Sequence, residues 1–291
     1  MNAIIFGYNG QDGIYLKELL LENSIEVVTV SRKNADIICN IQDYNSVEKI
    51  IREKNPDFIF HFAANSTVSH SALFENNDAI SNGTLNILES VFKNKLTSKV
   101  FISGSAMQFS NNGTPINELT PFEPSSPYSV ARIHSVYLAR YYRNYCGLKT
   151  YVGYFFNHDS PMRTERHFNQ KIVQAVLRIA NGSKEKPDLG DLSIKKEFNF
   201  AGDFMKAVWC LVNQEDVHEV VIGSGVTNSL QDWVEYCFKK KGLNWKDYIT
   251  GEQSFKNDYQ CLVSDPSLLM SLGWKPSFDI AGLADLMLES K

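Results

Sequence analysis

The chain has 291 residues, 43% of them hydrophobic and 21% charged, which is typical of a soluble globular protein with one large or two coupled domains. Its formal net charge is −4, so the overall charge recruits neither nucleic acid nor an anionic membrane surface. No apolar run reaches the roughly 18 residues that a membrane span needs. We therefore expect neither nucleic acid nor a membrane among the partners.

Five cysteines are widely spaced, and no C-x-x-C pair occurs among them. This spacing is typical of reduced thiols that fill a core, so we predict no disulfide framework and no metal site. The N-terminus runs directly into an apolar segment, without the basic segment and cleavage site of a secretory leader. We therefore expect a cytoplasmic protein.

Apolar strands and amphipathic helices alternate through the first half of the chain. Strand, glycine-rich turn and helix occupy 2–23, and further strands are predicted at 25–33, 56–64, 98–106 and 148–156, with helices at 46–55, 82–95 and 128–147. This alternation predicts an α/β fold in which crossover helices cover a parallel sheet.

After residue 157 the pattern changes to a polar loop, a helix up to about 182, and a mixture of short strands, loops and helices. We predict a dinucleotide-binding domain over 1–157, to which later segments return, and a substrate-binding domain mainly over 158–291. The chain has no long linker, so the two parts are expected to meet across one cleft, where ligands usually bind.

Three glycines follow the first strand at the mouth of the first helix: Gly7, Gly10 and Gly13, in the pattern G-x-x-G-x-x-G. Glycine lets the backbone turn tightly and approach a pyrophosphate, and the helix N-terminus offers free N–H groups to the anion. The order strand, motif, helix makes this a much stronger signal than the glycines alone. We interpret it as a dinucleotide site.

The end of the second strand reads "SRKN", where an NAD enzyme often has an acidic residue. The guanidinium of Arg32 suits a 2′-phosphate, so NADP is predicted and NAD is the alternative; an ordinary solvated basic turn is the other interpretation. Asp43 is placed at the adenine edge, and Ala63, in "HFAA", where the chain passes the dinucleotide. His61 is interpreted as a buried structural residue.

The stretch "SSPYSVAR" places Tyr128 four residues before Arg132. With lysine in place of Arg132 this would be the acid/base pair of a dehydrogenase. A phenol ordinarily titrates near pH 10 and needs a positive neighbour to act at neutral pH. Arginine keeps that charge but does not relay a proton, and its planar fork aims differently from an ammonium group.

Six segments in this order resemble the extended short-chain dehydrogenase/reductases: "GYNGQDGIYL", "HFAA", "YSVAR", "FFNHDSP", "LGDLSIKKEF" and "LGWKPSF". Within them the chain is most similar to the GDP-mannose 4,6-dehydratases and the related GDP-4-keto-6-deoxy-mannose reductases. The resemblance implies a Rossmann domain with a doubly wound parallel sheet, a smaller α/β C-terminal domain for a sugar nucleotide, and hydride transfer at C4 of the sugar. It also implies a homodimer or homotetramer formed through helices of the Rossmann domain.

The resemblance assigns Tyr128 as the catalytic tyrosine, Arg132 to the position of the family's lysine, and Ser105 as the hydroxyl that bonds the C4 oxygen. Dehydratases of this branch carry a glutamate two residues after that hydroxyl, where this chain has Met107. A thioether cannot act as a general base. We therefore expect Met107 to line the substrate pocket and expect no 4,6-dehydration by the family mechanism.

The resemblance also implies a site for the diphosphate of the sugar nucleotide. Asn157 matches a residue that holds the diphosphate or sugar, and Arg163 follows in the same loop. Lys196 and Glu197 stand in place of the family's Arg-Asp pair, and Lys256 is placed where a second anion-binding arginine is expected. Solvated surface lysines are the alternative interpretation of Lys196 and Lys256.

The leading prediction is an NAD(P)-dependent oxidoreductase at C4 of a nucleotide-linked, most plausibly GDP-linked, sugar in surface polysaccharide precursor synthesis, with 4-keto-sugar reduction ahead of C4 dehydrogenation. The first alternative is a 4,6-dehydratase or epimerase with another base, for which His134 and His158 are candidates by sequence proximity alone. The second is a non-catalytic sensor of a sugar nucleotide or dinucleotide.

Overall fold

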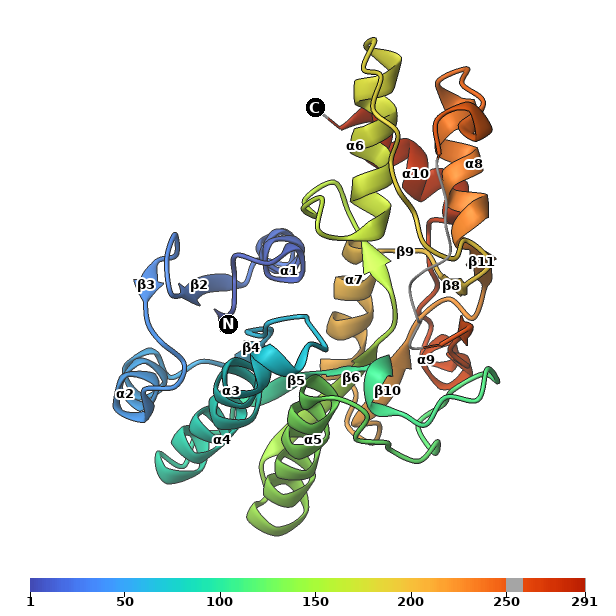
Figure 1. The fold of residues 1–291 in the computed structure, drawn as a ribbon. Helices are drawn as coiled ribbons and strands as arrows, with labels where there is room; N and C mark the ends of the chain where they lie inside the picture. Colours follow the sequence, from blue (N-terminus) through green and yellow to red (C-terminus); the bar gives the residue numbers. More distant parts are fainter. Residues whose placement is uncertain (250–258, 291) are drawn as a thin grey trace.

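A seven-stranded parallel sheet forms the centre of the molecule in the computed structural model, which describes residues 1–249 and 259–290 (Figure 1). The strand order is β10-β6-β5-β4-β1-β2-β3, and every neighbouring pair runs parallel. The strands are β1 (Asn2–Phe6), β2 (Glu26–Ser31), β3 (Ile37–Ile38), β4 (Phe58–His61), β5 (Lys99–Ser105), β6 (Lys149–Phe155) and β10 (Glu219–Ile222). The predicted α/β fold with a parallel sheet is confirmed.

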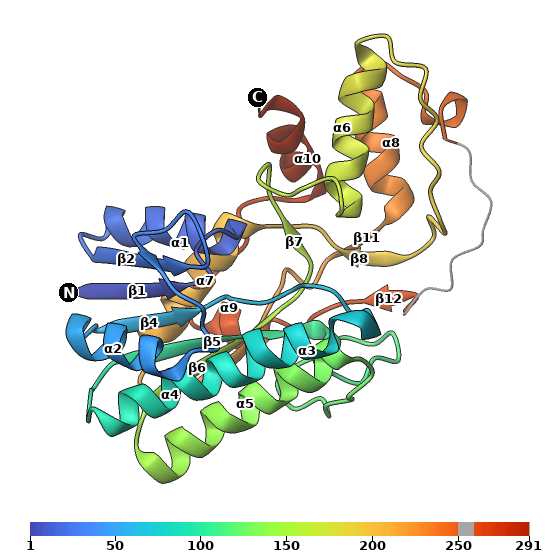
Figure 2. The same cartoon turned by 60° about the vertical axis from the view of Figure 1, so that its left-hand side comes forward.

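Helices cover both faces of this sheet (Figures 1 and 2). One face carries α1 (Gln11–Glu22) and α7 (Ala201–Val212), and the other carries α2 (Tyr44–Lys54), α4 (Gly83–Lys93) and α5 (Pro127–Cys146). Parallel strands that are buried on both faces are apolar throughout rather than alternating, and β1 and β4 follow this rule.

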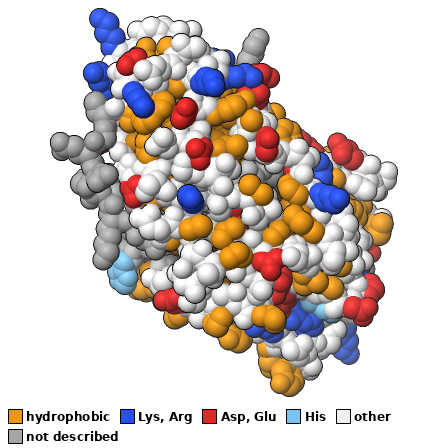
Figure 3. Space-filling view, turned by 90° about the vertical axis from the view of Figure 1, so that its right-hand side faces the viewer, with side chains coloured by type: hydrophobic (Ala, Val, Ile, Leu, Met, Phe, Trp, Pro, Cys, Tyr) orange, Lys and Arg blue, Asp and Glu red, His pale blue; other side chains and the backbone are white. Residues whose placement is uncertain are grey.

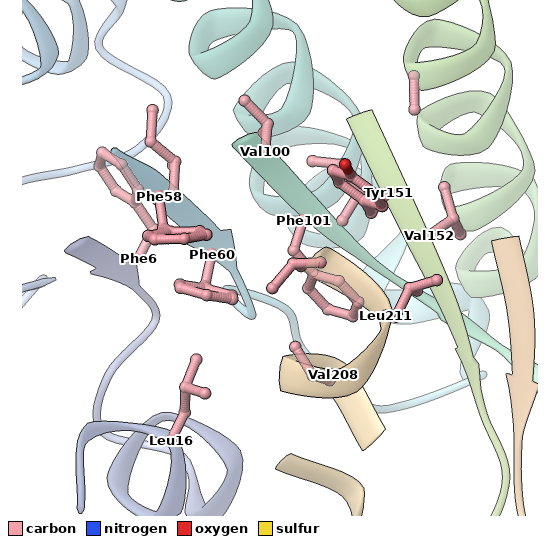
Figure 4. Packing of buried hydrophobic residues seen from close by; sticks show 14 of the residues in the cluster. Phe6, Leu16, Phe58, Phe60, Val100, Phe101, Tyr151, Val152, Val208 and Leu211 are labelled. Atoms are coloured by element: carbon pink, nitrogen blue, oxygen red, sulfur yellow. The ribbon is translucent and has the colours of Figure 1, made fainter. Parts of the chain in front are cut away.

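The main core lies between the sheet and its helices. Figure 4 shows Leu16 of α1 and Val208 of α7 against the face that carries Phe60 and Phe101. All four side chains are essentially excluded from solvent. Burial of side chains of this size contributes about 1.5–3 kcal/mol each relative to exposure, so the sheet edge that holds the site rests on a rigid base.

A second apolar cluster belongs to the smaller part of the molecule. Its helices are α6 (Phe168–Ala180), α8 (Leu230–Lys240) and α10 (Ile280–Glu289), which stand together above the large sheet in Figure 1. Two small sheets lie beneath them, made of β11 (Thr227–Ser229), β8 (Lys195–Glu197) and β12 (Cys261–Leu262), and of β7 (His158–Asp159) and β9 (Asn199–Phe200). The chain crosses between the parts more than once, because α7 and β10 return to the large sheet.

Several short elements complete the described chain. They are η1 (His70–Ala72), α3 (Leu73–Asn76), a π-helical turn η2 (Asn77–Asn82), η3 (Ala106–Gln108), η4 (Trp245–Asp247) and α9 (Ser267–Ser271). The sequence analysis assigned no element between residues 65 and 82, where η1, α3 and η2 lead into α4. None of the described helices is long and apolar enough to cross a membrane.

The face that carries α8 mixes acidic, basic and hydrophobic side chains, and no broad area of it is basic alone (Figure 3). This distribution agrees with the small net charge of −4. The face in view therefore offers no basic patch of the kind that nucleic acids require.

A buried ion network ties α5 to the edge strand β10. Glu219 accepts hydrogen bonds from Arg140 (2.7 Å), Arg143 (2.6 Å) and the Tyr154 hydroxyl (2.6 Å). Burial by itself raises the pKa of Glu219, but these hydrogen bonds outweigh it and lower the pKa to about 2. The carboxylate is 13% exposed, so solvent screens the network weakly.

We expect Glu219→Gln to lower the free energy of unfolding at pH 7 by up to about 3 kcal/mol, because two arginines lose their charged partner. A depressed pKa stabilises the fold above the ordinary value of 4.5, and this contribution is lost as the pH falls toward 2. Urea titrations should therefore show that the difference in free energy of unfolding between Glu219→Gln and the parent protein becomes smaller as the pH falls from 4.5 toward 2.

Glu215→Gln is the matched control. Glu215 also bonds two cations, Lys99 and Lys149, but its side chain is 66% exposed. Its replacement should leave the stability nearly unchanged. An equal loss in the two variants would contradict the role assigned to Glu219.

Candidate active site

Two adjoining cavities open along the carboxyl edge of the large sheet. The first, of about 340 Å³, is lined by the start of α1, the ends of β5 and β6, the start of α5 and the loop that leads into α6. The second, of about 560 Å³, lies over the ends of β1 and β2. Gly10, Phe62 and Ala64 line both, so the cavities form one continuous groove. Ligands of open parallel sheets bind at this edge.

The turn between β1 and α1 leaves no room for side chains. Gly7 has a φ of +83°, and a Cβ on it would lie 2.4 Å from the backbone nitrogen of Ala63. A Cβ on Gly13 would lie 2.6 Å from the Cα atom of Tyr8. Gly10 precedes α1, and no side chain caps that helix. The first amides of α1 are therefore left for an anion at the groove, which suits the pyrophosphate of a dinucleotide.

The first turn of α1 is also tied to the segment after β6. Gln11 donates to the carbonyl of His158 (3.2 Å) and accepts from the hydroxyl of Ser160 (2.8 Å). His158 places Nε2 3.0 Å from Asp12 and Nδ1 2.8 Å from the carbonyl of Phe156. Burial raises the pKa of Asp12, but the His158 interaction and the nearby arginines outweigh it, so the pKa is lowered. The segment "GYNGQDGIYL" contains both Gln11 and Asp12, but the sequence analysis assigned a role only to its glycines.

The second cavity is lined by Ser31, Arg32 and Lys33, as the sequence analysis expected for the adenosine end of a dinucleotide. The Arg32 side chain is 75% exposed and its Nη2 lies 3.9 Å from a carboxylate oxygen of Glu75. Asn9 fixes the turn by donating to the Ser31 hydroxyl and to the Lys33 carbonyl. The guanidinium therefore stands at the cavity rim, held only loosely.

Ala63 lines this cavity, but Asp43 does not. The Asp43 carboxylate is the N-cap of α2, where it accepts from the amides of Asn45 and Ser46. The hydroxyl of Ser46, together with these amides, lowers the pKa of Asp43. Its neighbour Gln42 reaches the cavity instead. The acidic residue that the sequence placed at the adenine edge thus begins a helix, and its contact with a cofactor stays a prediction.

Tyr128 and Ser105 line the first cavity together. Pro127 and the N-cap Ser126 start α5, so Tyr128 lies in its first turn. The catalytic roles that the resemblance assigned to Tyr128 and Ser105 stay predictions. Ser105 accepts a hydrogen bond from the Met107 amide (3.2 Å), which leaves its own hydrogen for a ligand oxygen. A phenol and a hydroxyl donor therefore face one space.

Arg132 lies one turn further along α5, is 5% exposed, and lines the same cavity. Its guanidinium carbon lies 5.1 Å from the centre of the Tyr128 ring, within the range of a cation–π interaction. Its Nη1 donates to both the carbonyl and the hydroxyl of Ser103, on β5. The fixed charge is thus held against the tyrosine ring from the sheet side.

His61 lies behind this group, at the end of β4, and is 1% exposed. Burial and the charge of Arg132 lower the pKa of His61 to about 3, although the carbonyls of Ala79 and Ile80 oppose the shift. Neither ring nitrogen makes a hydrogen bond of normal geometry to a described residue. His61 is therefore buried and neutral, as the sequence analysis expected.

The loop after β6 supplies polar groups to the other end of the first cavity. The Oδ1 atom of Asn157 is buried, and no described residue bonds it. Arg163 lies 3.2 Å from a carboxylate oxygen of Asp159 and donates to the carbonyl of His158 (3.2 Å). The sequence-predicted Asn157 and Arg163 thus line one wall of the first cavity.

Lys196 lies at the same wall and is 9% exposed, which excludes the solvated surface lysine considered from the sequence. Its Nζ lies 5.6 Å from the ring centre of Phe168 and 5.1 Å from that of Phe198. Burial lowers the pKa of Lys196, and the charge of Asp159 partly compensates. A partly desolvated cation of this kind attracts an anionic ligand strongly.

Glu197 does not face the cavity. Its carboxylate is fully buried and accepts from the amide and hydroxyl of Ser264 (both 2.6 Å) and from the amide of Ser224 (2.6 Å). It therefore joins segments of the smaller part. Lys256, the second predicted anion-binding lysine, lies outside the described residues.

Comparisons with known proteins agree with this geometry. The family model described as GDP-mannose 4,6 dehydratase matches residues 4–287. The Arabidopsis thaliana protein named GDP-mannose 4,6 dehydratase 2 is 30% identical over 321 residues, covering 99% of this chain and 86% of the relative.

The chain belongs to the GDP-mannose 4,6 dehydratase family.

Solved structures share the fold of this family member. One is dTDP-glucose 4,6-dehydratase from Bacillus anthracis in complex with NAD, with a TM-score of 0.86, 18% identity, and coverage of 99% of this chain and 96% of that chain. Another is RMD from Pseudomonas aeruginosa complexed with NADPH, with a TM-score of 0.86, 17% identity and the same coverage of 99% and 96%.

This member of the GDP-mannose 4,6 dehydratase family has a thioether at the position of the expected base. Met107 lines the first cavity and packs against Tyr128 and Ala131. It also lines a third cavity of about 270 Å³, together with the exposed carboxylate side chain of Glu123. The sequence analysis did not consider Glu123, which precedes the tyrosine by five residues and is brought next to Met107 only by the fold.

The two histidines proposed as other bases are placed differently. His158 is 8% exposed and lines the first cavity, whereas His134 is exposed on α5 and lines none of the three cavities described. The sequence analysis missed Ser103, whose role depends on a contact between β5 and α5. The spacing of residues in the sequence does not predict that contact.

We expect Gly7→Ala to lower the melting temperature by roughly 5 °C or more, because its Cβ would overlap backbone atoms and its φ is positive. Gly10→Ala is the control, since its Cβ would approach only the Gly7 carbonyl, at 3.8 Å. Differential scanning calorimetry of the two variants measures the contrast. Equal melting temperatures would contradict the close approach of Gly7 to Ala63.

Proposed function

We propose that the chain is an NAD(P)-dependent oxidoreductase that acts at C4 of a GDP-linked sugar. The observation that carries this proposal is the convergence of Ser105, Tyr128 and Arg132 on a cavity continuous with the Gly7–Gly13 turn. The names of the relatives support the nucleotide sugar and its GDP group. A non-catalytic sensor would gain nothing from the phenol and hydroxyl pair.

Each side chain has a defined task in this reaction. The bound dinucleotide supplies the hydride acceptor or donor. Tyr128 exchanges the proton of the C4 oxygen, Ser105 donates a hydrogen bond to that oxygen, and Arg132 holds a positive charge beside the phenol. Because arginine stays protonated, the proton on Tyr128 has to exchange through another route, such as water or the ribose of the dinucleotide.

The wall formed by Asn157, Arg163 and Lys196 suits the diphosphate of the sugar nucleotide. Three cations, Arg132, Arg163 and Lys196, line this cavity together with two carboxylates, Asp12 and Asp159, so the formal charges of the lining leave a positive excess. Arginine offers a planar fork and lysine a point charge, and both bind phosphate oxygens.

Two reactions at C4 remain, and each has an observation in its favour. The relatives are GDP-mannose 4,6-dehydratases, which supports the dehydratase alternative better than the 4-keto reductase put first from the sequence. Met107 favours plain C4 redox chemistry, because 4,6-dehydration also needs a base at C5. In a dehydratase that base would be a group other than residue 107, and His158 or Glu123 line the cavities nearest to it.

The deciding experiment incubates the protein with NAD(P)(H) and a panel of GDP-, CDP-, UDP- and dTDP-sugars, 4-keto forms included, followed by mass spectrometry. A change of two hydrogens identifies C4 oxidoreduction, and a loss of water identifies dehydration. We expect Tyr128→Phe to lower turnover by about 10³-fold or more while the dinucleotide still binds. Turnover unchanged in that variant would defeat the assignment of Tyr128.

The preference for NADP over NAD rests on Arg32. We expect Arg32→Ala to weaken NADPH binding about tenfold and NADH binding less than twofold, since only NADPH has the 2′-phosphate. Fluorescence titration measures both affinities. Arg52→Ala, a surface arginine paired with Glu48 on α2, is the control and should change neither. Equal effects of Arg32→Ala on the two cofactors would remove the basis for NADP.

We also propose a homodimer formed through α5. Tyr137, Tyr141 and Tyr145 are spaced by four residues on this helix and are 57%, 53% and 82% exposed. Three large aromatic side chains on one exposed helical face are typical of an interface. A homotetramer and a cytoplasmic location, both expected from the sequence, stay predictions.

Light scattering after size-exclusion chromatography tests the dimer. Tyr141→Glu combined with Tyr145→Glu should convert it to a monomer, because charges would be buried without partners. Leu119→Glu is the control, since Leu119 is 91% exposed and lies outside α5. A monomeric parent protein would refute the proposal.

A further inference from the structure

We propose that Ser103 is a positioning residue, which makes an arginine serviceable at position 132 by fixing its guanidinium beside Tyr128. The inference rests on the proposed C4 chemistry and deepens it. It explains how Arg132 could replace the lysine that the resemblance implies at this position, although arginine is longer than lysine and ends in a planar group.

Ser103 makes three hydrogen bonds at this point. Its hydroxyl donates to the carbonyl of His61 (2.9 Å) and accepts from Nη1 of Arg132 (2.8 Å). Its carbonyl accepts from the same Nη1. The hydroxyl is 3% exposed as part of β5, so water does not compete for these partners. One serine thus links β4, β5 and α5.

The anchor determines which face of the guanidinium remains for the cavity. Nη1 is turned to β5, and the group lies 5.1 Å from the Tyr128 ring centre. The Nε atom of Arg132 is buried, and no described residue accepts its hydrogen. Two acceptors on Ser103 hold Nη1, which restricts rotation of the planar group and keeps its remaining donors in one orientation.

Loss of the serine hydroxyl has two consequences. The His61 carbonyl loses a donor in a buried place, and Nη1 keeps only the backbone carbonyl as its acceptor. The guanidinium can then pivot about that single bond, and its charge moves relative to Tyr128. An ammonium group is a compact point charge with three rotatable donors and a shorter reach. Lysine at position 132 therefore does not depend on the Ser103 hydroxyl.

The test is a double-mutant cycle with Ser103→Ala and Arg132→Lys, each alone and combined. We expect Ser103→Ala alone to lower kcat about tenfold and to weaken NADPH binding severalfold, with KM for the sugar nucleotide within twofold. The same substitution added to Arg132→Lys should change kcat and NADPH affinity by less than about twofold. The proposal needs this non-additivity.

Ser98→Ala is the matched control. Ser98 is 2% exposed, stands just before the same strand, and donates its hydroxyl to the carbonyl of Pro56 (2.5 Å). It thus loses a buried bond toward β4 that is comparable with the one from Ser103 to His61. The melting temperature of Ser98→Ala should fall by about as much as that of Ser103→Ala. The kcat and NADPH affinity of Ser98→Ala should equal those of the parent.

Equal losses of kcat from Ser103→Ala in the parent and in the Arg132→Lys background would overturn the proposal, as would no loss in either. A uniform absence of dinucleotide binding and turnover in all proteins would defeat the proposed function instead. In that event, urea unfolding of the parent, the two single variants and the double variant still tests the contact between Ser103 and Arg132. Additive losses of stability would then show that Ser103 does not hold Arg132 either.

Discussion

The common direction of the seven strands is the constraint on which the site depends. Because every pair is parallel, all carboxyl ends reach one edge, and each connection must leave that edge and return over a face of the sheet. The glycine turn after β1, the basic turn after β2, Ser105 after β5 and the polar loop after β6 are thereby gathered in one groove. Helix α5 contributes Tyr128, which lies in its first turn and lines the cavity at the same edge.

Two side chains, Arg132 and Met107, set the chemical character of this groove, and both differ from the residues that the resemblance led us to expect. Arg132 replaces a titratable cation by a permanent one and is fixed to the sheet by Ser103. Met107 leaves an apolar wall where an acid/base group is expected, while Glu123 offers a carboxylate to the neighbouring cavity. Ser105, Tyr128 and Arg132, to which we assign the proposed C4 chemistry, thus line one cavity, whereas the wall at Met107 offers no acid/base group.

The sequence predicted well whatever depends on local order along the chain. The strand–glycine–helix unit, the long helix predicted at 128–147 and the buried state of His61 all followed from short stretches of sequence. Contacts between distant segments were not predictable in this way: the Asp12–His158 pair spans 146 residues, and the Ser103 anchor needs the register of β5 against α5. Lys196 was ambiguous for the same reason, because two aromatic rings from other positions decide its burial.

Strand β10 has a consequence for the order in which the protein is made. The large parallel sheet is completed by a strand that begins at residue 219, and Glu219 on it forms ion pairs with two arginines of α5. A nascent chain that has emerged only as far as β6 therefore exposes an unpaired sheet edge beside uncompensated positive charges. The large sheet is therefore complete only after residues 219–222 have been made, and we expect a fragment cut near residue 157 to aggregate rather than fold as an independent unit.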